Sequence, residues 1–554
     1  MRALTRAVGE RALKSPWALI AGNVAVLAVA SVAAAGAPAE LGIGSTRLDD
    51  DAASLLVVLE GDEAADSRVL GVTRDVVVAQ VEADPAVAGV EVQPAARSAQ
   101  RLVLVVDTQD ASSAERQEAL ERLEARIDPG PLRVLIGGET AVLTEARQDV
   151  GGDLWRLELL MLPFVFLVAA LTLGPRLAPA ALLSAAMGIT ATLAAMRALG
   201  LVLDVSLLGI APAFVISAVV GLELPALLVQ RYRAEPARSP PAMALRRALE
   251  SSGGLIALAC GLAAVPAFGL LVTGLDQAPS LILGCGLAAI FVAGSALIST
   301  AALIALYPPL RAGVERRRRV PEWLTASTLR AVGSLLVAVA AVAAVAVPSL
   351  DGVSRALVAT DLSAGSEAAL AAKLGDVTLA GGGSLLGDLP LAAIVATGLV
   401  AIVALAIARR PGFVLAALVT PLPAAAGIGA SVFVFQQGNL AELFGAETTD
   451  GVQTAAVACA ATAVAAVTAA RTGLVLAAMH AERRQGTIPV PPAEQIGAML
   501  LPGVLAATLV GVLVASALIG ADLDAAKQFG LACAVGLLAD LLLRVPLLAV
   551  LARL

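Results

Sequence analysis

The sequence is poor in the residues that usually build chemical sites. It has a single histidine, His480, and four cysteines that all lie in apolar runs: Cys260, Cys285, Cys459 and Cys533. Because all four lie in apolar runs, a disulfide framework in the polar part of the chain is excluded. A buried free cysteine behaves as a small hydrophobic residue. One histidine with no cysteine near it does not make a metal site. We therefore expect no metal ion and no cofactor.

Charged and aromatic residues are also scarce, at 15% and 3% of the chain. No basic, aromatic-rich stretch indicates a nucleic-acid partner. The sequence has no nucleophile set beside a base and no phosphate-binding loop, so we expect that the protein is not an enzyme.

Apolar residues dominate instead. They make up 58% of the 554 residues, and the mean hydropathy is +0.87, whereas a soluble domain is about 45–50% apolar. The excess lies in long, continuous runs of Ala, Leu, Val and Gly. A run of roughly 18 or more such residues crosses the hydrocarbon core as a helix, because lipid offers the backbone no hydrogen-bond partner.

The first apolar run, 16–37, follows four basic residues: Arg2, Arg6, Arg11 and Lys14. A cleaved signal peptide with a small-residue site ending at Ala39 is one interpretation. The length of the run and the membrane helices after it favour an uncleaved signal anchor. The basic residues then place the N-terminus in the cytoplasm.

Residues 39–152 are polar, and their apolar stretches are short. The alternation of strand-like and helix-like stretches predicts a β-α-β-β-α-β order, which is the order of a ferredoxin-like unit. The predicted elements are strand 54–60, helix 67–82, strands 87–92 and 101–107, helix 113–127 and strand 132–137. Another small α+β domain is the alternative.

The rest of the chain returns to membrane helices. Together with the first run, they are predicted at 16–37, 155–174, 178–199, 206–230, 254–275, 280–306, 331–348, 389–408, 412–435, 454–479, 496–519 and 528–551. Loops that this count places in the cytoplasm carry arginines, among them Arg231, Arg233, Arg409 and Arg410, whereas the opposite loops carry acids. This charge asymmetry supports the count and places both termini in the cytoplasm.

The two halves repeat, because each begins with one helix and an outside segment and continues with five helices. We therefore predict an α-helical membrane protein of about twelve transmembrane helices in two parallel six-helix repeats, with one ferredoxin-like α+β extracytoplasmic, porter-like domain. The predicted segments are the cytoplasmic N-terminus and first membrane helix (1–38), the extracytoplasmic domain (39–153), helices 2–6 (154–310), a cytoplasmic basic linker (311–330), helix 7 (331–348), a short extracytoplasmic segment (349–388) and helices 8–12 (389–554).

Short motifs connect this pattern with a known family. They are Gly137-Gly138 and Asp153 before the second span, G-L-E-L-P-A-L-L-V-Q-R-Y-R at 221–233, and Gly536, Asp540, Arg544 and Pro546 in the last span. They are similar to a GG…D pattern, to G-V-D-Y-A-L-F-L-V-S-R-Y-R and to a G…D…VR…P ending. The chain thus resembles the MmpL (mycobacterial membrane protein large) transporters of the RND superfamily.

The chain also departs from that family. Glu223-Leu224 stands where the family has an Asp-Tyr pair, and the tenth span has Arg471-Thr472 where the family has a second pair. The second outside segment, 349–388, is too short for a second porter-like domain.

Glu223 is the candidate for a proton relay. It lies eight residues before Arg231, about 12 Å from that end of the helix, which is too deep for hydration from the end. Burial disfavours the charged carboxylate, so Glu223 either takes a proton or pairs with a cation. Intramembrane acids are functional candidates, but a structural ion pair or a permanently protonated Glu223 remains the alternative.

Three more ionisable residues are candidate intramembrane charge partners. Arg471 lies at a similar depth in the repeat-equivalent helix, and the resemblance implies that the two helices face each other, so we hypothesise a Glu223–Arg471 ion pair. Arg471 could instead extend towards the cytoplasm. Asp540 and Arg544 are four residues apart on one helix and are interpreted as a self-contained structural pair.

The resemblance implies a multi-pass transporter of the bacterial cytoplasmic (inner) membrane that exports lipidic or hydrophobic cargo with the proton gradient. Membrane lipids and this cargo are the expected partners, and a homo-oligomer is left open. One alternative is a non-transporting relative that acts as a membrane scaffold or partner subunit. Another is a SecDF-like accessory of protein export.

Overall fold

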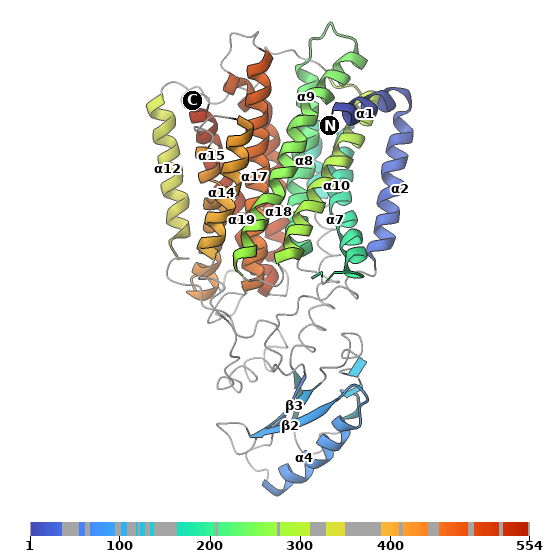
Figure 1. Cartoon of the computed structure of the whole chain (residues 1–554), viewed down its shortest axis with the longest axis vertical. Coiled ribbons are helices and arrows are strands. Elements are labelled where there is room, and N and C mark those ends of the chain that lie inside the picture. The colour runs from blue at the N-terminus through green and yellow to red at the C-terminus, as the bar shows by residue number, and fades with distance from the viewer. Residues whose placement is uncertain are drawn as a thin grey trace.

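The computed structural model describes residues 2–35, 55–60, 67–94, 101–107, 118–119, 122–123, 125–127, 133–137, 163–203, 205–206, 209–273, 278–310, 328–348, 389–408, 414–440, 454–485, 492–519 and 524–551. It shows a bundle of long helices with a small sheet beyond one end (Figure 1). The N-terminus and the C-terminus both lie at the end of the bundle opposite the sheet (Figure 1).

The first half of the bundle contains α1 (Arg2–Lys14), α2 (Pro16–Ala34), α7 (Ala178–Gly200), α8 (Ile210–Ala234), α9 (Pro241–Ala264) with the 3-10 helix η2 (Val265–Thr273), and α10 (Ala278–Leu306). The second half contains α12 (Thr328–Ala346), α14 (Leu389–Ala408), α15 (Val414–Leu418), α16 (Pro421–Ser431) with the π-helix η6 (Val432–Gln436), α17 (Thr454–Gln485), α18 (Pro492–Ile519) and α19 (Asp524–Leu551).

Ten of the described helical segments are long and apolar enough to cross a membrane. This confirms the prediction of an α-helical membrane protein. Two further predicted spans coincide with shorter apolar helices, Pro163–Leu173 and Ala393–Val403, the second of which lies within α14. The total of twelve spans therefore stays a prediction.

Some helix boundaries differ from the predicted ones. Helix α1 was not predicted. The predicted span 412–435 is divided into α15, α16 and η6. Proline lacks a backbone N–H and is favoured in the first turn of a helix, and Pro421 begins α16 after the break.

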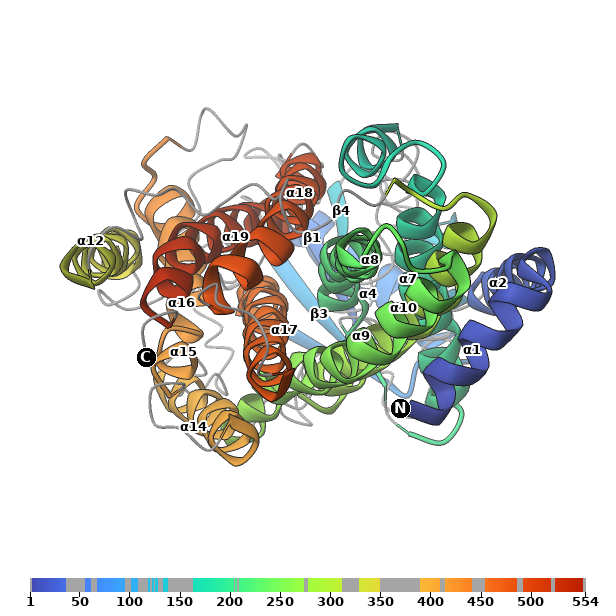
Figure 2. The same ribbon diagram turned by 90° about the horizontal axis from the view of Figure 1, so that it is seen from above.

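Corresponding helices of the two halves pack in corresponding ways. Helix α2 contacts α7 and α10, as α12 contacts α16 and α19. Across the two halves, α8 contacts α18, and α17 contacts α9. Helices α8 and α17 are the most enclosed, with 94% and 89% of their apolar windows buried, and they lie near the centre when the bundle is viewed from above (Figure 2). These contacts agree with the predicted repeat.

The sheet consists of β1 (Leu55–Glu60), β2 (Gly89–Pro94), β3 (Arg101–Asp107) and β4 (Arg133–Gly137), and helix α4 (Ser67–Glu82) joins β1 to β2. The strand order is β2-β3-β1-β4, and all neighbours are antiparallel. This is the strand order of a ferredoxin-like sheet. The predicted helix 113–127 is described only in part, and it is helical at the described residues between 118 and 126.

A small apolar core joins the sheet to its helices. Val57 and Leu104 from the strands pack with Val77 of α4 and Leu123. At the edge of this core, the carboxylate of Asp84 accepts hydrogen bonds from Arg122 at 2.9 and 3.0 Å and from the backbone N–H of Ala86 at 3.0 Å. The hydrogen bonds from Arg122 and Ala86 lower the pKa of Asp84 against the opposing effect of burial.

Small residues set the closest contacts within the bundle. A Cβ atom at Gly284 of α10 would overlap the carbonyl oxygen of Gly209, and one at Gly427 of α16 would overlap that of Ala532 in α19. In lipid, helices gain little from hydrophobic exclusion, so close van der Waals packing at small residues has to hold them together.

We expect Gly284→Ala to destabilise the bundle by about 1–3 kcal/mol, because the added methyl group has no space between α10 and Gly209. Thermal unfolding of the purified protein in detergent measures this. Gly286→Ala is the matched control on the same helix, since its Cβ would lie at an ordinary 3.8 Å from Ala264. Equal unfolding temperatures for the two variants would contradict the prediction.

We expect Asp84→Asn to weaken the sheet unit, because it removes the charged acceptor of two Arg122 hydrogen bonds. The folded-state pKa of Asp84 is lowered, so its stabilisation is complete above the ordinary pKa of 3.8 and is lost as the pH falls through the folded value. Hydrogen exchange of the strand amides should therefore be faster in the variant near neutral pH. The difference between variant and wild type should shrink in acid, and a difference that grows in acid would contradict this assignment.

Candidate functional site

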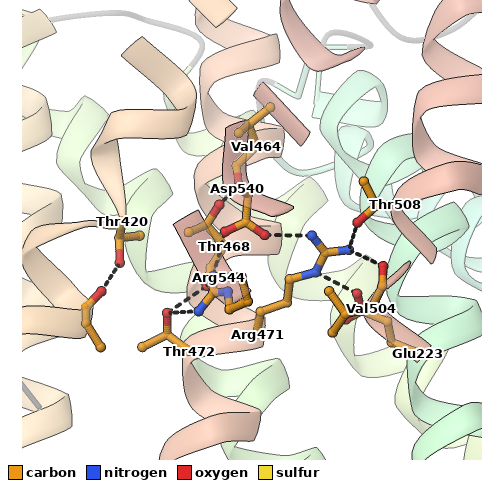
Figure 3. Close-up of polar contacts among 11 residues, drawn as sticks. Glu223, Thr420, Val464, Thr468, Arg471, Thr472, Val504, Thr508, Asp540 and Arg544 are labelled. Atoms are coloured by element: carbon orange, nitrogen blue, oxygen red, sulfur yellow. Dashed lines mark hydrogen bonds and ion pairs between the residues drawn. The ribbon is translucent and has the colours of Figure 1, made fainter. Parts of the chain in front are cut away.

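Four charged side chains meet inside the bundle. Glu223 belongs to α8, Arg471 to α17, and Asp540 and Arg544 to α19. Their exposed fractions are 3%, 1%, 1% and 3%. Figure 3 shows the side chains pointing towards one another from these helices. We call these four residues the charge network.

Arg471 is the centre of the network. Its Nε donates to Glu223 Oε1 at 2.6 Å, and its Nη1 donates to Asp540 Oδ2 at 2.6 Å. Its Nη2 donates to Thr508 Oγ1 at 2.9 Å and to the carbonyl oxygen of Val504 at 3.4 Å, both on α18. The hypothesised Glu223–Arg471 ion pair is therefore present. The alternative in which Arg471 extends to the cytoplasmic surface is wrong, because its guanidinium is held inside the bundle.

Asp540 and Arg544 form the expected pair on one turn of α19, with Nη2 donating to Oδ1 at 2.6 Å. The interpretation of a self-contained pair is nevertheless wrong, since the other oxygen of Asp540 accepts from Arg471. Asp540 thus bridges two arginines. Arg544 in turn donates to Thr472 Oγ1 and to the Thr468 carbonyl oxygen, both at 3.0 Å.

The charges of the network balance when all four groups are ionised, because two arginines face two carboxylates. An isolated charge in the hydrocarbon costs roughly 2.5–3.5 kcal/mol on the insertion scale, so mutual pairing is what allows these residues to be buried. The planar guanidinium group donates in several directions at once. This is why one arginine can connect α8, α18 and α19.

The threonines of the network were not predicted. Thr468, Thr472 and Thr508 are each buried, and the Thr472 hydroxyl also donates to the Thr468 carbonyl oxygen at 2.9 Å. For Thr468 and Thr472 the available signal was a polar residue one turn or less from Arg471 in an Ala-rich span, whereas Thr508 lies in an apolar span far from any charged residue of its own helix. That signal is weak, because threonine often bonds only to its own helix.

Two polar atoms of the network have no hydrogen-bond partner among the residues that the structure describes: Oε2 of Glu223 and Nε of Arg544. Glu223 is therefore bound to the network through one oxygen, whereas Asp540 uses both. Of the two carboxylates, Glu223 is the one with an oxygen left over for a further ligand.

Two glycines of the sequence motifs, Gly221 and Gly536, lie at close helix crossings. A Cβ atom at Gly221 would lie 3.0 Å from the backbone nitrogen of Ala185 in α7, and one at Gly536 would lie 2.8 Å from Val464 in α17. Arg233 donates to the Leu173 carbonyl oxygen at 3.0 Å. Gly138 and Asp153 lie outside the described residues. Gly221 and Gly536 thus allow the helices that carry Glu223 and Asp540 to pack closely against their neighbours.

The described residues contain no group of three or more His, Cys, Asp or Glu side chains that could hold a metal ion. The four cysteines are free and lie within the apolar helices.

A model of the MMPL family matches residues 46–330. The solved structures that resemble the chain include the crystal structure of SecDF, a translocon-associated membrane protein, from Thermus thermophilus. This likeness has a TM-score of 0.54 and 15% identity over 96% of this chain and 99% of that one. A crystal structure of SecDF in a super-membrane-facing form has a TM-score of 0.55 at 15% identity, over 96% of this chain and 97% of that one. The comparison with curated proteins found no match.

We expect Arg471→Ala to destabilise the protein by roughly 3–5 kcal/mol, because it leaves two buried carboxylates without their shared cation. Arg471→Lys should recover only part of this loss, since an ammonium group lacks the guanidinium fork. Thermal unfolding in detergent measures both. Arg238→Ala, at an exposed arginine between α8 and α9, is the control. A stability of Arg471→Ala equal to that of the control would show that the network does not hold the helices together.

Proposed function

The chain belongs to the MMPL family, and from this premise we propose that it exports lipidic or hydrophobic cargo by means of the proton gradient, with Glu223 as the proton-carrying residue. At the coarser level, it is an RND-like membrane transporter or transport accessory, and a multi-pass protein of the bacterial inner membrane. Members of this family are transporters rather than enzymes. The cargo class is proposed from the family alone.

The observation that carries the proposal is the position of the Glu223–Arg471 contact between the two halves of the bundle. Glu223 belongs to the first half and Arg471 to the second, and their atoms are 2.6 Å apart. A proton on Glu223 would remove the attraction between these two charges. Arg471 would then be held by Asp540 and Thr508, which both belong to its own half.

Protonation of Glu223 would in this way weaken the Glu223–Arg471 ion pair between the halves. The contacts of Arg471 inside the second half would remain. Alternating access in transporters built from repeats is a movement of one half against the other. If Glu223 takes up a proton from one side of the membrane and releases it to the other side, the movement of the halves is coupled to the proton gradient. We propose that the termini are cytoplasmic and that the sheet lies outside, as the arginine-rich loops indicate.

We propose membrane lipids and a lipidic or hydrophobic cargo as partners, and a homo-oligomer is left open. The cargo would enter from the outer leaflet between helices and pass the sheet domain.

One observation favours a second candidate, a non-transporting scaffold or partner subunit. The network is electroneutral and contains an arginine at the position where the resemblance implies a carboxylate, as expected for a structural cluster of ion pairs. A permanently paired Glu223 would hold the halves together and carry no proton.

Proton-gradient-driven efflux of labelled lipid from proteoliposomes separates the two candidates. We expect the wild type to show gradient-dependent efflux and Glu223→Gln to lose it, because the amide cannot take up and release a proton. The control is Glu250→Gln, at the half-exposed acid of α9 that pairs with Arg6 at 3.9 Å, and it should transport as the wild type does. Thermal unfolding of each variant checks that it is folded.

No efflux above that of empty liposomes with any lipid class would favour the scaffold. Efflux that persists in Glu223→Gln would exclude Glu223 as the relay without excluding transport.

A further inference from the structure

The N-terminal helix α1 lies across the end of the bundle that holds the termini, beside α9 and α10 (Figure 2). Only Ser15 separates it from α2, which runs along the bundle (Figure 1). The 19 residues of α2 rise about 28 Å, close to the thickness of roughly 30 Å of the hydrocarbon core. Helix α1 therefore lies at the level of the lipid headgroups on the side of the termini.

Helix α1 is closely fitted against α9. A Cβ atom at Gly253 of α9 would overlap the side chain of Thr5, and one at Gly9 of α1 would lie 3.1 Å from Leu249. The residue numbers in these contacts rise along α1 and fall along α9, so the two helices run antiparallel. The C-terminal end of α1 therefore lies beside the N-terminal part of α9.

Both of these ends are basic. We call the exposed face of α1 and of residues 235–250, which include the start of α9, the basic surface. Its exposed basic residues are Arg6, Arg11, Lys14, Arg238, Arg246 and Arg247, and its acids are Glu10, Glu235 and Glu250. The basic residues outnumber the acids two to one, so the surface carries a net positive charge.

Most of these cations lack a carboxylate partner. Two ion pairs are present, Arg6 with Glu250 at 3.9 Å and Arg247 with Glu235 at 3.8 Å. The other four basic residues have no ion pair among the residues that the structure describes; they are Arg11, Lys14, Arg238 and Arg246.

The docking of α1 brings unpaired cations of two helices onto one surface. Cγ of Arg246 would lie 3.8 Å from a Cβ atom at Gly9, so this arginine of α9 lies against α1. Arg11 follows Gly9 by two residues. Like charges that are held near one another raise the free energy unless negative charge lies close to them. The basic surface is therefore complementary to a negatively charged partner.

Apolar side chains are exposed beside these cations. Leu4 is 53% exposed and lies seven residues, or two turns, before Arg11. Met243 is 46% exposed and lies one turn before Arg246. Trp17, in the first turn of α2, is 63% exposed, and tryptophan gathers at the membrane–water interface. Exposed apolar residues beside cations are typical of helices that lie in the headgroup layer of a membrane.

We propose that the basic surface binds the negatively charged headgroups of phospholipids in the leaflet on the side of the termini. Charge complementarity carries the proposal, because four cations without carboxylate partners share one surface at headgroup level. The lipid phosphates would contact these cations, while Leu4 and Met243 enter the apolar boundary of the same leaflet. The site needs neither Glu223 nor transport, so its test is independent of the proposed function.

Native mass spectrometry of the full-length protein in detergent tests the site. The protein is titrated with dioleoyl-phosphatidylglycerol or dioleoyl-phosphatidylcholine, which share their acyl chains and differ in headgroup charge. We expect the first phosphatidylglycerol to bind about ten-fold or more tightly than the first phosphatidylcholine. Equal binding would overturn the proposal and leave the surface to an acidic protein partner.

Arg11→Gln combined with Arg246→Gln should weaken phosphatidylglycerol binding about 25-fold, because each cation near an anionic surface contributes about five-fold. Phosphatidylcholine binding should not change, and Arg246→Lys, which keeps the charge, should bind as the wild type does. Arg176→Gln is the matched control, since Arg176 is exposed and lies over the ring of Tyr307, outside the basic surface. An equal loss in this control, or no loss in the double variant, would overturn the proposal.

A second pair of variants tests whether docking of α1 builds the surface. Gly253→Val should lower phosphatidylglycerol binding about five-fold or more, because it displaces Thr5 while every charge remains. Gly254→Val is the matched control on the same helix, since a Cβ atom there meets nothing within 4 Å. Thermal unfolding checks that both variants are folded. Equal binding by the two would contradict a surface built from α1 and α9 together.

Thermal unfolding also separates a lipid from a free phosphate. Phosphatidylglycerol should raise the unfolding temperature of the wild type and not that of the double variant, because a ligand stabilises the state that binds it. Sodium phosphate should have no more effect than sodium chloride at equal ionic strength. Stabilisation by inorganic phosphate alone would assign the surface to a soluble phosphate compound and overturn the lipid assignment.

Discussion

A buried charge within lipid must have a partner of opposite charge, and the centre of this bundle follows from that constraint. Four ionisable groups are buried among the helices, and each is paired with a group of opposite charge. Arg471 holds the arrangement together, since its guanidinium bonds to a carboxylate on α8, a carboxylate on α19 and two oxygens on α18. The helices around it must therefore keep their relative heights and rotations.

The network is also asymmetric in a way that separates its two acids. Both oxygens of Asp540 accept from arginines, whereas Glu223 has one oxygen bonded to Arg471 and one without a partner among the residues that the structure describes. Two carboxylates of similar intrinsic acidity thus occupy different environments, and environment decides which of two acids changes protonation state. Asp540 suits a permanent anchor for the two arginines, and Glu223 suits exchange.

The two halves of the bundle have corresponding helix contacts but carry different charges at their central helices. Helices α8 and α17 occupy equivalent central places, but one carries the acid and the other carries the base. The pair therefore links the halves to each other. Close crossings at Gly284, Gly427 and Gly511 lie in helices of the same bundle, so small residues allow the helices around this link to pack tightly.

The sequence by itself determined the class of the protein, most helix positions and the strands of the small domain, because hydrophobic run length and alternation are local properties of the chain. Strand Arg101–Asp107 and helix Ser67–Glu82 have the predicted bounds. It also indicated Glu223 and Arg471 as partners, through depth and repeat position. Only the tertiary structure decided that Asp540 bridges both arginines, that Thr472 and Thr508 complete the network, and that one oxygen of Glu223 has no partner among the described residues. These features depend on the rotation and separation of helices far apart in the chain, which a pattern within one helix does not encode.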